Sequence, residues 1–180
     1  MSKKVRNIIL ICISIIAISS LALVFTPFSY TKDDIKYYKD LTKNNKILPK
    51  LDNLGNYIDI KFKYYHKDVI IFESDAYTLT VKYDENNFNN EVAKINNNYH
   101  FQNNTVKDIN NEFNPNFTID DYEFKLLSLD EYDLLSFPKE IYLIGFDNKN
   151  HEIIYIYFYD NDLDYITSFK DFLYEYCDWQ

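Results

Sequence analysis

The residues best placed for chemistry are three alternate aspartates near the C-terminus, Asp160, Asp162 and Asp164. Oxygen ligands at alternate positions are typical of a calcium-binding loop. Tyr165, however, stands where the sharp turn of such a loop needs glycine, and Asp171 replaces the usual bidentate glutamate. We therefore predict no metal site here, and we treat the three aspartates as the candidate acidic contact face for a basic protein or peptide.

The three histidines, His66, His100 and His151, are the other candidate metal ligands or bases. Two of them fall at predicted turns, and His100 precedes an asparagine-rich stretch. A zinc site needs further Cys, His or carboxylate ligands at short, regular spacings, which these positions lack. We therefore expect exposed histidines and no metal site.

Nucleophilic catalysis is not indicated by any motif. The chain has two glycines, Gly55 and Gly145, so it contains neither a G-x-S-x-G turn nor a glycine-rich phosphate loop. Cys177 is the one thiol outside the N-terminal apolar segment that contains Cys12, and we interpret it as a small buried hydrophobic residue. The sequence thus predicts no catalytic residue and no cofactor.

The N-terminus has the pattern of a membrane anchor. Three basic residues, Lys3, Lys4 and Arg6, precede the uncharged segment Ile8–Phe25. A helix of that length spans about 27 Å at 1.5 Å per residue, close to the thickness of the hydrocarbon core. The positive flank places the N-terminus in the cytoplasm and the rest of the chain outside a single-pass anchor in the cell membrane. The alternative is a signal peptide cleaved after Ser20-Leu21-Ala22, which would release a secreted protein.

Composition limits what the aromatic residues can indicate. The chain contains 18 tyrosines and 14 phenylalanines beside many asparagines, lysines and isoleucines. All of these residues have AT-rich codons, so a low-GC bacterial genome explains their number without any ligand. Hydrophobic residues make up 47% of the chain, which is enough to bury a core.

Negative charge gathers at the C-terminal end. The chain carries a net charge of −9, and residues 120–180 alone hold 15 acidic and 4 basic residues. Nucleic-acid binding requires clustered lysine and arginine, so we predict no nucleic-acid partner. The acidic region favours either a basic partner or simple solubility.

The first half of the chain predicts a helix and linker after the membrane segment, followed by the first strands of a sheet. Residues 31–48 have a sparse helical pattern after Thr31, and residues 50–56 resemble a linker, so 31–56 are predicted as a juxtamembrane helix and linker. Strands are predicted over 57–65, 69–72 and 77–83, separated by turns at 66–68 and 73–75. A helix is predicted over Glu85–Tyr99, with Asp84 as its cap.

The second half predicts a hairpin and a closing helix. Residues 101–116 resemble a polar loop with a helical turn around 106–113, and a strand follows near Phe124. Glu140–Phe146 and Glu152–Tyr159 are predicted as strands joined by the turn 147–150. The second of these is apolar on both faces, which is typical of a central strand. The helix Asp162–Cys177 ends the chain.

Together these patterns predict an α+β domain over residues 57–180. It has a mostly antiparallel sheet of five to six strands and two packed helices, and it follows an N-terminal transmembrane helix within residues 1–30. The predicted function is a non-catalytic, extracytoplasmic binding or accessory module. The alternative is an exported hydrolase whose site combines dispersed carboxylates such as Asp120, Asp121 and Glu123. The sequence does not indicate an oligomeric state.

Overall fold

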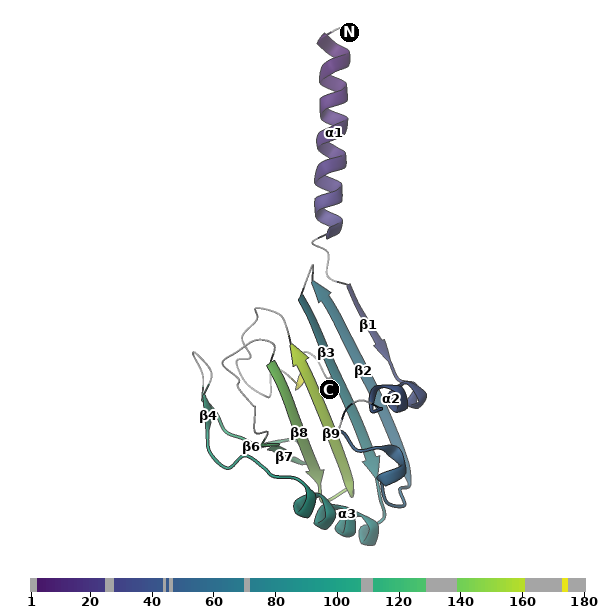
Figure 1. The fold of residues 1–180 in the computed structure, drawn as a ribbon, viewed down its shortest axis with the longest axis vertical. Helices are drawn as coiled ribbons and strands as arrows, with labels where there is room; N and C mark the ends of the chain where they lie inside the picture. The colour runs from purple at the N-terminus through teal and green to yellow at the C-terminus, as the bar shows by residue number, and fades with distance from the viewer. Residues whose placement is uncertain are drawn as a thin grey trace.

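The fold centres on an antiparallel sheet of seven strands in the order β1-β2-β3-β9-β8-β7-β6 (Figure 1). The structure is a computed structural model, and it describes residues 3–24, 28–43, 45, 47–69, 72–107, 112–128, 139–160 and 173–174. The strands of this sheet are β1 (Phe28–Lys32), β2 (Asp59–Val69), β3 (Phe72–Lys82), β6 (Asn116–Ile119), β7 (Tyr122–Leu126), β8 (Lys139–Asp147) and β9 (Glu152–Asp160). The helices are α1 (Lys3–Val24), α2 (Ile35–Leu41) and α3 (Glu85–Asn98).

The predicted hairpin β8–β9 is confirmed. Asp147 accepts backbone hydrogen bonds from Lys149 (2.9 Å) and Asn150 (2.9 Å), which closes the turn between the strands. β9 lies between β3 and β8, and its residues are buried from Ile153 to Phe158. A strand that is apolar on both faces is therefore the middle strand of the sheet, as its pattern predicted.

The hairpin β2–β3 corrects three short elements of the sequence interpretation. The turns predicted at 66–68 and 73–75 are wrong, because both segments belong to long strands in which His66 pairs with Asp75. Polar residues resemble a turn in sequence, but here His66 contacts the carboxylates of Asp68 and Asp75 within the paired strands. The strand predicted over 69–72 is also wrong: Val69 ends β2 and Phe72 begins β3.

The helix predicted over residues 31–48 is wrong in its first and last parts. Thr31 does not cap a helix but pairs with Tyr65, which makes β1 an edge strand of the sheet. The helix α2 starts after Asp34, whose carboxylate accepts a hydrogen bond from the backbone of Lys36 at 2.8 Å. Tyr38 of α2 is fully buried against the sheet.

The other helices agree with the sequence to different extents. α3 is confirmed, and Asp84 caps it by accepting the backbone N–H of Asn87 at 2.8 Å. The helical turn predicted around 106–113 is wrong, because β4 (Val106–Lys107) pairs with β5 (Glu112–Phe113). The predicted helix Asp162–Cys177 lies outside the described residues except at 173–174, which are helical, and Leu173 is fully buried.

The sheet packs two cores of different composition. We call one side the aliphatic face; its buried residues are Ala76, Ile119, Phe124, Leu126, Ile141, Leu143, Ile154, Ile156, Phe158 and Leu173. We call the other side the tyrosine face, because its core includes Tyr38, Tyr64, Tyr83, Tyr142, Tyr155 and Tyr157. α2 and α3 pack on the tyrosine face through Tyr38, Phe88 and Ile95.

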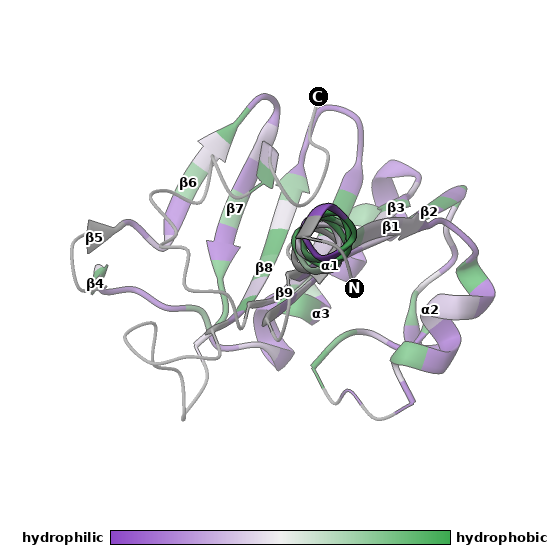
Figure 2. Cartoon of the chain, turned by 90° about the horizontal axis from the view of Figure 1, so that it is seen from above, coloured by the Kyte–Doolittle hydropathy of each residue, from purple (hydrophilic) through white to green (hydrophobic). Residues whose placement is uncertain are grey.

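The helix α1 projects from one end of the sheet (Figure 1). Seen end-on in Figure 2, its turns are mostly hydrophobic. Among the described residues, no helix combines the length and the apolar character needed to cross a membrane. The transmembrane helix predicted over Ile8–Phe25 is therefore not confirmed and stays a prediction, and Phe25 itself lies outside the described residues.

Candidate functional site

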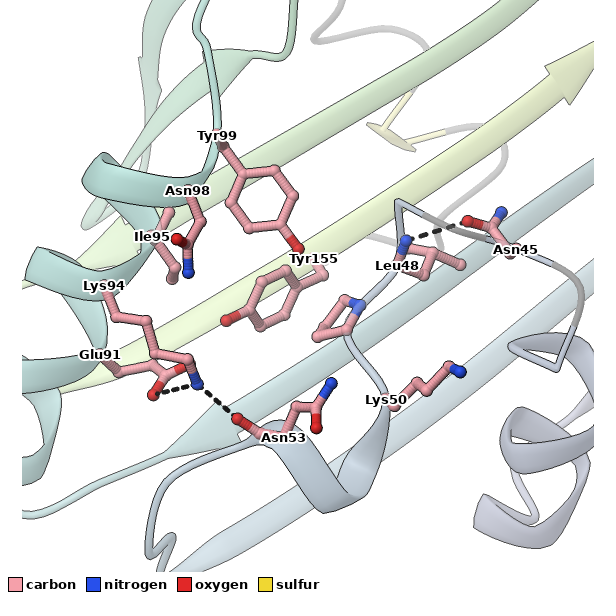
Figure 3. Close-up of a pocket in the computed structure, with 11 residues that line it drawn as sticks. Asn45, Leu48, Lys50, Asn53, Glu91, Lys94, Ile95, Asn98, Tyr99 and Tyr155 are labelled. Carbon is pink, nitrogen blue, oxygen red and sulfur yellow. Dashed lines mark hydrogen bonds and ion pairs between the residues drawn. The ribbon is translucent and has the colours of Figure 1, made fainter.

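A pocket of about 180 Å³ lies on the tyrosine face, between α3 and the segment that precedes β2 (Figure 3). Its floor is β9, one wall is α3 and the other wall is the segment 45–54. It is smaller than the roughly 300–1,000 Å³ typical of pockets for drug-sized ligands, so its size suits one small molecule. The lining residues are Asn45, Leu48, Pro49, Lys50, Asn53, Glu91, Lys94, Ile95, Asn98, Tyr99 and Tyr155.

The helix α3 brings a buried carboxylate to this pocket. Glu91 lies three residues after Phe88 and four before Ile95, so helical geometry places it on the buried side of α3. Its side chain is only 7% exposed, and its two carboxylate oxygens lie 3.0 and 3.2 Å from the Lys94 ammonium. A buried carboxylate is costly unless it is paired, and Lys94 supplies the pairing charge.

The strand β9 brings a buried phenol to the floor of the pocket. Tyr155 is 3% exposed, and its hydroxyl has no hydrogen-bond partner among the described residues. Figure 3 shows this hydroxyl pointing toward the pair Glu91–Lys94. Burial, with a smaller contribution from nearby Tyr83 and Glu91, raises the pKa of Tyr155 well above its usual value. The phenol is therefore neutral and keeps a proton to donate.

A second buried phenol lies close to the same carboxylate. The hydroxyl of Tyr83 also lacks a partner among the described residues. A Cβ atom placed on Gly55 would lie 3.4 Å from the Glu91 carboxylate and 4.0 Å from the Tyr83 ring, so both groups border this glycine. Buried hydroxyls without a partner are uncommon in folded proteins, and here two of them gather around one buried carboxylate.

Hydrogen bonds tie the wall formed by residues 45–54 to the helices α2 and α3. Tyr38 donates its hydroxyl to the carbonyl of Pro49 at 2.6 Å, and Tyr99 donates to the carbonyl of Ile47 at 2.9 Å. The ammonium of Lys94 also donates to the carbonyl of Asn53. Among its described residues the segment has one short helical turn, Leu51–Asn53, yet its backbone is fixed at three points.

The chemistry of the pocket is that of a polar binding site. In its described lining Glu91 is the one carboxylate, whereas glycoside hydrolysis of the usual kind requires two. No group of three potential metal ligands occurs within the described parts of the chain. What the pocket offers is an ion pair of zero net charge, a neutral phenol and several amide and apolar side chains.

A second polar cluster surrounds His66 at the end of the sheet from which α1 projects. Its Nδ1 lies 2.8 Å from a carboxylate oxygen of Asp75, and its Nε2 lies 2.9 Å from Asp68. Tyr64 donates its hydroxyl to the same Asp75 oxygen at 2.6 Å. Burial alone would lower the pKa of His66, but the hydrogen bonds and charges of the two aspartates outweigh it and raise that pKa.

The expectation that the histidines are exposed turn residues is wrong for His66, whose side chain is 12% exposed within β2. The carboxylates of Asp68 and Asp75 pair with His66 and allow its side chain to be largely buried. The local sequence does not show this pairing. His100 is exposed beside a short bridge between Phe101 and Leu127. His151 lies in the β8–β9 turn, as predicted, where its φ is 56°.

The predicted acidic contact face is described only at its first residue. Asp160 is the last residue of β9, where its backbone pairs with Ser74 and Lys139. Asp162 and Asp164 lie outside the described residues, as does Cys177. The structure therefore leaves the acidic contact face as a prediction.

Sequence reasoning missed the pocket because three separate segments form it. One local signal was available: Glu91 interrupts the helical stripe of Phe88, Val92 and Ile95 with a charge. Tyr155 gave no such signal, because a tyrosine on a strand that is apolar on both faces looks like any other core residue.

Comparison with known proteins adds no further constraint on the pocket. The chain matches no family model, no curated protein and no solved structure. The functional argument therefore rests on the residues and their geometry.

Proposed function

We propose that this protein is a membrane-tethered binding or accessory module, without catalytic activity, whose sheet domain lies outside the cytoplasm. The observation that carries the proposal is the contrast between α1 and the rest of the chain. Apolar side chains of α1 between Val5 and Ile18 are exposed, among them Ile8, Ile13 and Ile16. Exposed apolar side chains of this kind are stable when an apolar environment surrounds them, and a lipid bilayer provides one.

The orientation follows from charge at the start of α1. Lys3, Lys4 and Arg6 precede the apolar run, and positive flanks stay in the cytoplasm. The sheet domain begins at β1, directly after the apolar segment, and would then face the outside of the membrane. A cleaved signal peptide is the alternative, and it leads to the same compartment.

The proposal of binding rather than catalysis is supported by the pocket on the tyrosine face. Its described lining supplies one carboxylate, Glu91, which Lys94 already pairs. A hydrolase with dispersed carboxylates would need a second acid facing the first across a bound substrate. A fixed wall, a buried carboxylate paired with Lys94, and a phenol without a partner among the described residues fit recognition of a small ligand.

Topology is tested with reporters fused after Gln180 in living bacterial cells. Alkaline phosphatase is active when exported, and green fluorescent protein fluoresces when it stays in the cytoplasm. We expect phosphatase activity and recovery of the full-length chain in the membrane fraction. Fluorescence with an inactive phosphatase would contradict the proposal. Recovery of a soluble mature chain starting near Leu23 would replace the anchor with a signal peptide.

A matched pair of variants separates anchoring from folding. Replacing both Ile13 and Ile16 with lysine places two charges in the apolar run, at about 2.5–3.5 kcal/mol each at the centre of a bilayer. We expect this variant to leave the membrane fraction. Ile58→Lys is the control, because Ile58 is 65% exposed, as is Ile16, but belongs to the sheet domain. If the α1 variant stays in the membrane as fully as the control, α1 is not the anchor.

A further inference from the structure

We propose that the pocket on the tyrosine face binds a neutral polyhydroxylated molecule, a single sugar unit, between Tyr155 and the Glu91–Lys94 pair. The inference deepens the binding function proposed above and rests on it. The two sources of such a ligand are a free monosaccharide and the terminal unit of a longer glycan.

The hydrogen-bonding groups at the base of the pocket favour a ligand whose groups can both donate and accept hydrogen bonds. The Tyr155 hydroxyl is buried, unpartnered within the described chain and aimed into the pocket. The Glu91 carboxylate keeps acceptor positions beyond those used by Lys94, since a carboxylate offers about four. A sugar hydroxyl can accept from the phenol and donate to the carboxylate at once.

The charges of Glu91 and Lys94 disfavour a charged ligand in the pocket. A bound anion would face Glu91, and a bound cation would face Lys94, so either would have to disturb the pairing of the buried Glu91 carboxylate with the more exposed Lys94 ammonium. Lys50 also lines the pocket, but it is exposed, and in Figure 3 its ammonium points away from Tyr155. A neutral ligand leaves the pair intact and gains its hydrogen bonds.

The remaining lining fits the two kinds of surface that a sugar ring presents. Leu48, Pro49 and Ile95 offer apolar contacts for the C–H groups of the ring. Asn53 and Asn98 are exposed, and each side-chain amide carries both a donor and an acceptor for outer hydroxyls. The volume of about 180 Å³ favours one unit over a chain lying along the pocket.

The test is a titration of the full-length chain in detergent micelles, followed by NMR of tyrosine side chains labelled with carbon-13. The free-sugar probes are D-glucose and N-acetyl-D-glucosamine, and the chain-end probes are cellotetraose and chitotetraose. Sodium acetate and tetramethylammonium chloride serve as anionic and cationic probes. We expect a saturable shift of the Tyr155 resonance with at least one sugar and none with the two ions. Binding of the tetrasaccharides alone would assign the ligand to a glycan end.

Three variants make the result specific. Tyr155→Phe should weaken sugar binding by about two- to tenfold, which corresponds to one hydrogen bond, without lowering the melting temperature. Glu91→Gln should weaken it as well. Tyr157→Phe is the matched control, because it lies on the same strand and face but donates its hydroxyl to Glu140, away from the pocket. It should bind the sugar as the unchanged chain does.

The proposal is overturned if no sugar gives a saturable shift of Tyr155, if the ions bind there in place of sugars, or if Tyr155→Phe binds as tightly as the unchanged chain. These outcomes are independent of the reporter assay. A chain that is exported but binds no sugar contradicts this inference alone, and a cytoplasmic chain that binds sugar contradicts the membrane proposal alone.

Discussion

The two faces of the sheet pack against cores of different chemistry. On β9, Ile154, Ile156 and Phe158 enter the aliphatic face, whereas Tyr155 and Tyr157 enter the tyrosine face. Aliphatic side chains need close packing and nothing else. Each buried tyrosine also brings a hydroxyl that must find a hydrogen-bond partner or destabilise the fold.

On the tyrosine face most buried hydroxyls have a hydrogen-bond partner, and two have none among the described residues. The hydroxyls of Tyr38, Tyr64 and Tyr157 donate to Pro49, Asp75 and Glu140 respectively. Those of Tyr83 and Tyr155 donate to nothing in the described chain. Tyr155 lines the pocket, and Tyr83 borders Gly55 beside the pocket's Glu91.

The difference between the two faces indicates where a ligand-binding site is expected. On a face held together by apolar contacts, every residue is explained once it is packed. On a face of tyrosines, the hydroxyls that remain unsatisfied mark the place where a ligand can complete the structure.

The largest effect is expected on the aliphatic face. Ile156 is fully buried on the central strand, so Ile156→Ala should lower the free energy of unfolding by about 2–5 kcal/mol. Urea denaturation measures this as a shift in the midpoint at constant slope. The control is Ile58→Ala, at an exposed isoleucine, which should change stability by less than about 0.5 kcal/mol. An unchanged midpoint for Ile156→Ala would mean that β9 is not central.

The next largest effect tests how tightly the aliphatic face is packed. A methyl group on Gly145 would lie 2.6 Å from the Phe124 ring and 2.7 Å from Ile154, so Gly145→Ala should destabilise the fold by about 1–3 kcal/mol. Gly55→Ala is the comparison on the tyrosine face, where the nearest atom would be at 3.4 Å. Thermal unfolding of both variants measures the contrast. Equal melting temperatures would show that the ring of Phe124 can shift to make room for the methyl group at little cost.

A smaller effect separates satisfied from unsatisfied hydroxyls within the tyrosine face. Tyr38→Phe leaves the carbonyl of Pro49 without its donor and should cost about 0.5–1.5 kcal/mol. Tyr155→Phe removes a hydroxyl that bonds to nothing in the described chain, so it should cost nothing or stabilise slightly. Chemical denaturation without added sugar measures both. A loss for Tyr155→Phe as large as that for Tyr38→Phe would show that its hydroxyl is already satisfied.

The smallest effect concerns pH and the cluster at the end of the tyrosine face. Asp68, Asp75 and the ring of Tyr30 surround His66, whose pKa is raised in the folded chain. A raised pKa contributes stability that is fully present below the unfolded value of about 6.5 and is lost as pH rises through the folded value.

We therefore expect the chain to be more stable at pH 6 than at pH 9, by an amount that His66→Gln removes. Melting temperatures of both proteins across this range measure the difference. The same pH dependence in both proteins would assign it to other groups.

The sequence alone determined the elements whose evidence is local. Alternation around Phe124 predicted β7, two apolar runs around a polar turn predicted β8 and β9, and the stripe of Phe88 and Ile95 behind a capping aspartate predicted α3 within one residue. A strand apolar on both faces predicted its own central position. These features follow from the periods of strand and helix, which a short window of residues is enough to reveal.

Only the tertiary structure decided the features that depend on distant partners. His66 and Asp75 resemble turn residues until β2 and β3 place them opposite one another. Tyr155 looks like core until α3 brings Glu91 toward its hydroxyl and leaves that hydroxyl unpaired. Hydrogen bonds and ion pairs act over a few ångströms in space, whatever the distance along the chain, so the local pattern cannot show which polar residues will meet.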